Sequence, residues 1–232
     1  MYILFFALAV LCAAGAAALV WYERTHEPDV HRARADWAAQ REFVFDRADP
    51  ALAKRWHRGG MNVPGDAEVV DVAHGTYFGA PAYVFDVRDA VTVVAVARDG
   101  ASGVLLDLRA PDVEAPREPG MDPLGTVGPR VLYTNNADVA RRVCDPRLVR
   151  LAEQVPAHIE SLWNEGAWAL AALPLTEIDA DIDEALEAAR QFRDLLRVLP
   201  PEGRGRAVPP TPRDPGQPLP SRASGSVSRS VR

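Results

Sequence analysis

The histidines are the first residues to test for chemistry, because imidazole is both a common metal ligand and a common general base. Only His26 and His31 lie close together, in the stretch HEPDVH. Their five-residue spacing, with Pro28 between them, does not place both rings on one face of a helix. No cysteine pair accompanies them, so we predict no metal site. The other histidines are His57, His74 and His158.

The two cysteines, Cys12 and Cys144, do not form a disulfide framework. Cys12 lies inside an apolar stretch and Cys144 lies in the polar part of the chain, so the two thiols can hardly meet. A nucleophilic thiol needs a base to activate it. His74 and His158 are the candidates, but nothing in the sequence brings either one to Cys144. We therefore interpret Cys144 as a buried structural thiol.

Three aspartates, Asp71, Asp86 and Asp107, interrupt apolar stretches that are typical of strands. Carboxylates on a shared face could act as general acid and base. We interpret them instead as the solvent-facing side of an amphipathic sheet. The chain also contains no G-x-S-x-G, P-loop or G-x-G-x-x-G motif. We predict no catalytic, cofactor-binding or metal-binding residues, and no cofactor.

The charge of the 232-residue chain is uneven. The formal net charge is −6, and residues 201–232 contain six arginines and two acids, so this tail is +4 and the remainder is −10. An acidic body argues against nucleic acid as a partner, because phosphate binding requires clustered cations. The tail is rich in proline, arginine and serine and has few large apolar residues, which predicts disorder over 201–232.

The elements that would position any site begin with an apolar stretch. Residues 2–22 contain 21 residues without a charge, and a helix of that length is roughly 30 Å long, enough to cross a bilayer. We predict a transmembrane helix over 1–22 that contacts the bilayer through residues 2–22. A cleaved signal peptide and a lipoprotein leader ending at Cys12 are the alternatives. Small residues four apart favour a weak homodimer of such helices, and they are Ala13, Ala14, Ala17 and Ala18.

The residues after this stretch indicate an orientation. Arg24 and Arg32 follow the apolar residues and no lysine or arginine precedes them. Because positive charge favours the cytoplasmic side, we expect a single-pass protein of the cell membrane with a cytoplasmic domain. An envelope-facing domain is the alternative. Residues 23–43 are predicted to form a charged juxtamembrane helix.

The next part of the chain predicts an antiparallel sheet. Runs rich in β-branched and aromatic residues are separated by short turns, which is typical of hairpins. Alternation along them indicates one buried face. We expect a meander of four strands, then a strand at 130–135 and a hairpin over 158–173, about six or seven strands in all. Residues 111–129 contain several prolines and predict a loop. The first four strands are expected at 67–78, 82–89, 91–98 and 104–110.

Helices complete the predicted domain over 44–200. Residues 136–155 predict helix on both sides of Pro146, and residues 179–199 predict a long C-terminal helix with an apolar stripe. The fold class is therefore α+β, with an N-terminal transmembrane helix and a mainly antiparallel sheet that carries its helices on one side. A pleckstrin-homology-like barrel is an alternative closure of this sheet.

Several stretches in this order resemble a known group of proteins. The segment HGTYFGAPAYVFD, the strand TVVAVAR and the late strand GAWAL follow the apolar N-terminal stretch and precede a final helix. This arrangement resembles actinobacterial single-pass, membrane-anchored proteins of unknown function. The resemblance implies no catalytic residue and no cofactor.

These observations favour a membrane-tethered, non-enzymatic binding or scaffold domain with an unknown protein partner. The alternative is a membrane-anchored enzyme of hydrolase type with an unrecognised site.

Overall fold

The computed structural model describes residues 15, 32–63, 65 and 67–202. The chain divides into two units, residues 1–202 and residues 203–232, and the description below concerns the first. The strands are β1 (Val44–Ala48), β2 (Val69–Tyr77), β3 (Ala80–Val87), β4 (Val91–Ala97), β5 (Leu106–Arg109), β6 (Asp122–Val127), β7 (Arg130–Thr134), β8 (Ser161–Glu165) and β9 (Trp168–Pro174). The helices are α2 (Ala137–Val143), α3 (Pro146–Gln154) and α4 (Asp179–Leu195), with short 3₁₀ turns η1 (Leu52–Lys54), η2 (Gly59–Met61) and η3 (Leu196–Val198).

The strands form one nine-stranded sheet in the order β1-β2-β3-β4-β9-β8-β5-β7-β6, and every neighbouring pair is antiparallel. The predicted hairpins β2–β3, β3–β4 and β8–β9 are confirmed. The predicted four-stranded meander is wrong at its last strand. The β8–β9 hairpin is inserted between β4 and β5, so β4 pairs with β9 and β5 pairs with β8 and β7.

The predicted strand count is also wrong, because β1 and β6 were missed. Both are edge strands and β1 is mostly exposed, so its residues lack the apolar alternation of a half-buried strand. Pro123 lies within β6, and the register shifts between Pro123 and Gly125. Proline is tolerated at a sheet edge, where the ladder is paired on one side alone. Since β1 and β6 are the two edges of an open sheet, the described strands do not close into the pleckstrin-homology-like barrel that was the alternative.

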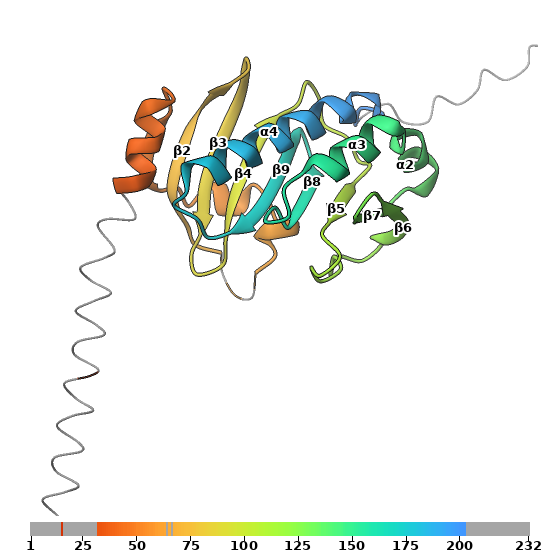
Figure 1. Ribbon diagram of the computed structural model, residues 1–232, viewed down its shortest axis with the longest axis horizontal. Coiled ribbons are helices and arrows are strands. Elements are labelled where there is room, and N and C mark those ends of the chain that lie inside the picture. The colour runs from red at the N-terminus through yellow and green to blue at the C-terminus, as the bar shows by residue number, and fades with distance from the viewer. Residues whose placement is uncertain (1–14, 16–31, 64, 66, 203–232) are drawn as a thin grey trace, which may run out of the picture. The chain divides into compact units, whose positions relative to one another are not determined.

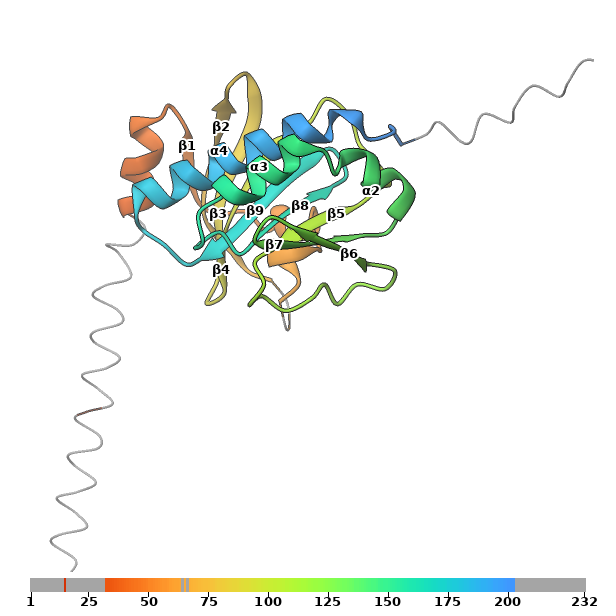
Figure 2. The ribbon, with the colours of Figure 1, turned by 45° about the vertical axis from the view of Figure 1, so that its right-hand side comes forward.

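Both faces of the sheet are covered, whereas the sequence predicted one buried face and helices on one side. Helices α2, α3 and α4 pack on one face, with α4 lying across the central strands (Figures 1 and 2). The turns η1 and η2 bring Leu52, Trp56 and Met61 onto the opposite face, against Phe85 and Trp163. The central strands β4 and β9 are therefore buried along nearly their whole length. Such double burial is more usual in parallel sheets.

The helices predicted at 136–155 and 179–199 are present as α2, α3 and α4, although α4 ends at Leu195 and η3 follows it. Asn136 accepts a hydrogen bond from the backbone N–H of Val139 and caps α2, and α3 begins at Pro146, a favoured first helical residue. The apolar stripe of α4 is buried, as its spacing predicts. Its members are Ile182, Ala185, Leu186, Ala189 and Phe192 on α4, and the stripe continues through Leu196 of η3 and Leu199 directly after it.

The helical residues 32–40 belong to the core of this unit. Trp37 and Ala38 are buried against the face that carries α4, and the Trp37 indole N–H donates to Asp183 on α4. Arg34 donates to the buried carboxylate of Asp86 on β3 at 2.9 Å. A charged hydrogen bond thus joins helical residues 32–40 to strand β3.

The predicted transmembrane helix is not supported. Within the described residues, none of the helices combines the length and apolar character needed to cross a membrane. Apart from Gly15, the predicted span over 1–22 lies outside the described residues, and so do Ala13, Ala14, Ala17 and Ala18 of the predicted homodimer face. The disordered tail predicted for 201–232 lies outside them as well, except for its first two residues.

The turn η2 depends on a glycine. Gly59 has φ +55°, and a Cβ atom there would lie 2.5 Å from Cδ2 of the buried Trp163 ring. We expect Gly59→Ala to lower the free energy of unfolding by about 2 kcal/mol or more, since strain in the left-handed region adds to the clash. Gly100→Ala is the control, because no atom of the described chain beyond its neighbours lies within 4 Å of the position that its Cβ would take. Equal unfolding curves for the two variants in urea would contradict this account.

Candidate functional site

The described histidines lie in separate places. His74 Nε2 is 3.1 Å from Asp46 Oδ2, across β1 and β2. His57 lies near Glu165, with 3.8 Å between Nδ1 and the carboxylate. His158 Nε2 is 3.7 Å from Glu184 Oε2 and 4.0 Å from Asp181 Oδ1. No group of three or more potential metal ligands occurs in the described part of the chain. His26 and His31 lie outside it.

Cys144 is exposed, not buried as the sequence suggested. It follows α2 directly and caps its C-terminus. Partial burial of the thiol and the neighbouring charge of Asp145 raise the pKa of Cys144. A raised pKa reduces the thiolate fraction at neutral pH, so this site disfavours nucleophilic chemistry.

The three aspartates are buried, which corrects their interpretation as solvent-facing residues. Burial raises the pKa of Asp86, while the Arg34 charge and the Thr92 hydroxyl oppose that shift. Burial likewise raises the pKa of Asp107, opposed by the Arg109 guanidinium, which donates to both carboxylate oxygens at 2.8–3.1 Å. Asp71 lies at the register shift of β2 with φ +51°. Asp86 and Asp107 thus have structural partners.

An open groove of about 400 Å³ lies between α3 and α4, two helices that run side by side on one face of the sheet (Figure 2). Its floor is apolar and comes from both helices and the residues after α3. Its rim is acidic and comes from the first half of α4. The lining residues are Leu151, Gln154, Val155, Pro156, Asp183, Glu184, Glu187, Ala188 and Gln191. We call this the α3–α4 groove.

The acids of the groove are held in different ways. Asp183 binds the Arg41 guanidinium. Glu187 accepts hydrogen bonds from Arg190, Gln191 and the Tyr77 hydroxyl, and these bonds, Arg190 first, lower the pKa of Glu187. Glu184 has its carboxylate half exposed, with His158 as its nearest partner. The groove therefore offers an apolar floor beside an acidic rim, in which the lowered pKa of Glu187 keeps that carboxylate ionised at neutral pH.

No signal in the sequence indicated this groove. Its two walls are the helices α3 and α4, which are separated in the chain by the β8–β9 hairpin. The nearest local feature is the cluster of acidic residues in the first turns of α4. That cluster does not predict that the two helices lie together.

Comparison with known proteins identifies the family. Residues 1–231 match the family described as trehalose monomycolate transport factor TtfA. The chain belongs to this family. The resemblance to actinobacterial proteins is thereby confirmed in its coarser form, and the TtfA family is more specific than a group of unknown function.

Two relatives of this TtfA-family chain are informative. Trehalose monomycolate transport factor A of Mycolicibacterium smegmatis is 39% identical over 219 residues, which cover 93% of this chain and 79% of the relative. The crystal structure of the mycobacterial trehalose monomycolate transport factor A matches with a TM-score of 0.72 at 41% identity, and covers 74% of this chain and 97% of that chain. A transport factor implies an accessory function with protein partners, which agrees with the predicted non-enzymatic scaffold at that coarse level.

Proposed function

We propose that this chain is a non-enzymatic accessory factor for the transport of trehalose monomycolate, and that it works by binding a protein partner in the α3–α4 groove. The observation that supports the transport role is the 39% identity to the M. smegmatis transport factor along 93% of the chain. Such extensive similarity favours a shared role over a shared fold alone.

The chemistry of the groove suggests the kind of partner. The apolar floor formed by Leu151, Val155 and Ala188 suits an apolar side chain from the partner. The half-exposed carboxylate of Glu184 suits a flanking arginine or lysine residue. The body of the chain carries a net charge of −10, which would steer a basic segment toward it. We therefore propose a basic, amphipathic segment of a membrane transport protein as the occupant.

The groove can be tested by reversing its charge and filling its floor. We expect Glu184→Arg combined with Ala188→Trp to prevent the full chain from restoring trehalose monomycolate export in cells depleted of their own TtfA-family protein. The measurement is the amount of radiolabelled trehalose monomycolate retained by the cells, separated by thin-layer chromatography. We expect this variant to weaken partner binding by about tenfold or more, the usual effect of removing one anchor residue.

Asp138→Arg is the matched control for this experiment. Asp138 is an exposed acid on α2, outside the groove, where it pairs with Arg141 of the same helix. This variant should restore export as the unmodified chain does. If the groove variant is produced at a normal level and also restores export, the groove is not the partner site. If the unmodified chain fails to restore export, the transport role itself is wrong.

We also propose that the domain lies at the cytoplasmic face of the cell membrane. A lipid cargo supports a membrane location, and Arg24 and Arg32, which follow the apolar stretch, support the cytoplasmic side. Chemical labelling of the exposed Cys144 tests on which side of the membrane the domain lies. In a Cys12→Ser background, a membrane-impermeant maleimide should label Cys144 after lysis and leave it unlabelled in intact cells.

The raised pKa of Cys144 sets the conditions of that labelling. Because the thiolate is the reactive form, labelling of lysed cells should accelerate as the pH rises from 7 toward 9, and at each pH it should be slower than the labelling of an ordinary thiol. Labelling of intact cells at the rate found after lysis would place the domain outside the cytoplasm.

A further inference from the structure

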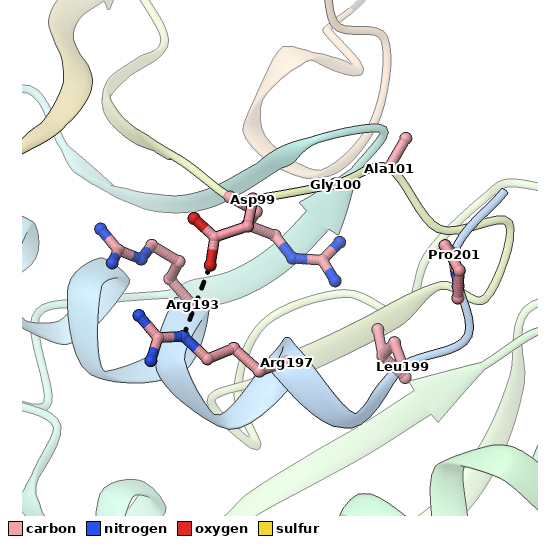
Figure 3. A pocket seen from close by; sticks show the side chains of 8 residues that line it. Asp99, Gly100, Ala101, Arg193, Arg197, Leu199 and Pro201 are labelled. Atoms are coloured by element: carbon pink, nitrogen blue, oxygen red, sulfur yellow. Dashed lines mark ion pairs between the residues drawn. The ribbon is translucent and has the colours of Figure 1, made fainter.

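A second hollow of about 330 Å³ lies at the C-terminal end of α4. The connection that follows β4 forms one wall, and the end of α4 with the residues after η3 forms the other (Figure 3). We call it the arginine pocket, because three arginines line it and Asp99 is the one acid among its lining residues. The lining residues are Arg98, Asp99, Gly100, Ala101, Arg193, Arg197, Leu199 and Pro201.

Arg193 is the unusual member of this set. Its side chain is only 11% exposed, and its nearest acid is Asp194, with 3.4 Å between Nε and Oδ1. The buried Nη1 atom has no hydrogen-bond partner within the described residues. A guanidinium carries five N–H donors, and a buried charged donor without an acceptor is costly. Such a group is expected where a ligand supplies the missing acceptor.

The charges of Arg98 and Arg197 are neutralised only in part. The Arg98 guanidinium donates to the backbone carbonyls of Gly166 and Leu196, at 3.2 and 3.0 Å, so its hydrogen bonds go to neutral groups. Burial lowers the pKa of Arg98. Arg197 lies 3.4 Å from Asp194, the acid that also lies beside Arg193, and 3.8 Å from Asp99 (Figure 3), whose side chain is 83% exposed. An ion pair this open to water neutralises little charge.

We propose that the arginine pocket binds a phosphate ester. Three arginines against Asp99 and the adjoining Asp194 leave a net charge of +1 at the pocket, which attracts the charge of about −1.5 to −2 on a phosphate monoester at neutral pH. Guanidinium forks bind phosphate oxygens in a bidentate manner. The volume of the pocket falls within the range of small-molecule sites and leaves room for more than the phosphate itself.

This site is separate from the α3–α4 groove and does not depend on the proposed transport role. On α4, the residues that line the groove end at Gln191, whereas those that line the pocket begin at Arg193. Two sources could supply the phosphate, a soluble phosphate compound or the headgroup of an anionic lipid. Leu199 and Pro201 in the wall provide apolar surface on which the remainder of either ligand could rest.

The test uses the purified full chain in a mild non-ionic detergent and isothermal titration calorimetry at constant ionic strength. The probes are inorganic phosphate and dihexanoyl phosphatidic acid, a short-chain lipid that dissolves as a monomer. We expect saturable binding that Arg193→Gln and Arg197→Gln each weaken by about tenfold or more, the usual effect of losing a charge-assisted hydrogen bond.

Arg150→Gln is the matched control, because Arg150 is an exposed arginine on α3 away from the pocket. It should change the Kd by less than about twofold. Arg197 has a side chain that is 59% exposed, so Arg197→Gln should fold even if Arg193→Gln does not. A clearly tighter Kd for the lipid identifies the headgroup as the source, and equal values identify soluble phosphate. Failure of both probes to bind, or binding that neither variant weakens, overturns the proposal.

Discussion

Arg34→Met should lower the free energy of unfolding by about 3–5 kcal/mol, the usual cost of removing one partner from a buried ion pair. Arg34 donates to Asp86 at 2.9 Å and to the backbone carbonyl of Thr176 at 3.2 Å, and both charged side chains are about nine-tenths buried or more. Without Arg34, the Asp86 carboxylate is left with the Thr92 hydroxyl, at 2.7 Å, as its side-chain donor in the described part of the chain. A buried carboxylate with so little compensation opposes folding.

Urea unfolding of residues 32–202 measures this effect, and Asp86→Asn is the informative second change. An asparagine oxygen can still accept from Thr92 but carries no charge. The double variant Arg34→Met/Asp86→Asn should therefore recover most of the lost stability. If the loss in the double variant equals the sum of the losses in the two single variants, the two side chains do not act as a pair.

The pH dependence of Arg34→Met has a defined sign. Burial already raises the pKa of Asp86, and loss of the Arg34 charge removes the main opposing effect. Between the unfolded carboxyl pKa, about 3.9, and the raised folded pKa, the folded state retains a proton that the unfolded state has released. Stability of the variant therefore falls as the pH rises through that window. Its deficit relative to the unmodified protein should be smallest near pH 4 and larger at pH 7.

Phe192→Ala should also cost about 3–5 kcal/mol, the usual range for a buried aromatic side chain. Phe192 is fully buried on the inner face of α4, in the core between that helix and the sheet. Its removal leaves a cavity that the packed strands can fill only in part. A loss of this size is a large share of the stability of a typical domain.

Val198→Ala is the matched control for Phe192→Ala. Val198 lies in η3, directly after α4, and is exposed. Its truncation should change the free energy of unfolding by less than about 0.5 kcal/mol. Equal and small losses for the two variants in urea unfolding would mean that α4 is not packed on the sheet. The α3–α4 groove and the arginine pocket would then lose their common wall.

Local patterns predicted the pieces of this fold well. The stripe of α4 repeats at three- and four-residue steps, and a helix with that spacing must place these side chains on one face. Pro146 with Asp145 before it specifies the start of α3. The hairpins β2–β3, β3–β4 and β8–β9 have short connections, which leave antiparallel pairing as the simple outcome. Each of these inferences rests on residues that are close in the sequence.

Only the tertiary structure decided how the pieces combine. The insertion of β8–β9 between β4 and β5 depends on pairing between strands some 70 residues apart, and no local pattern records such a partner. The same holds for burial of charge. Asp86 interrupts an apolar strand and so indicates a solvent-facing residue, but Arg34 from the start of the described chain covers it.

Arg193, in the arginine pocket, is a second charged residue whose burial the local sequence does not predict. Its position one step off the apolar stripe of α4 predicts an exposed side chain, yet the side chain is nearly nine-tenths buried. The sequence by itself determined the hairpins β2–β3, β3–β4 and β8–β9, the start of α3 and the inner face of α4, because backbone geometry links neighbouring residues directly. The tertiary structure alone decided the order of the sheet, the groove and the pocket, because these depend on which distant surfaces exclude water together.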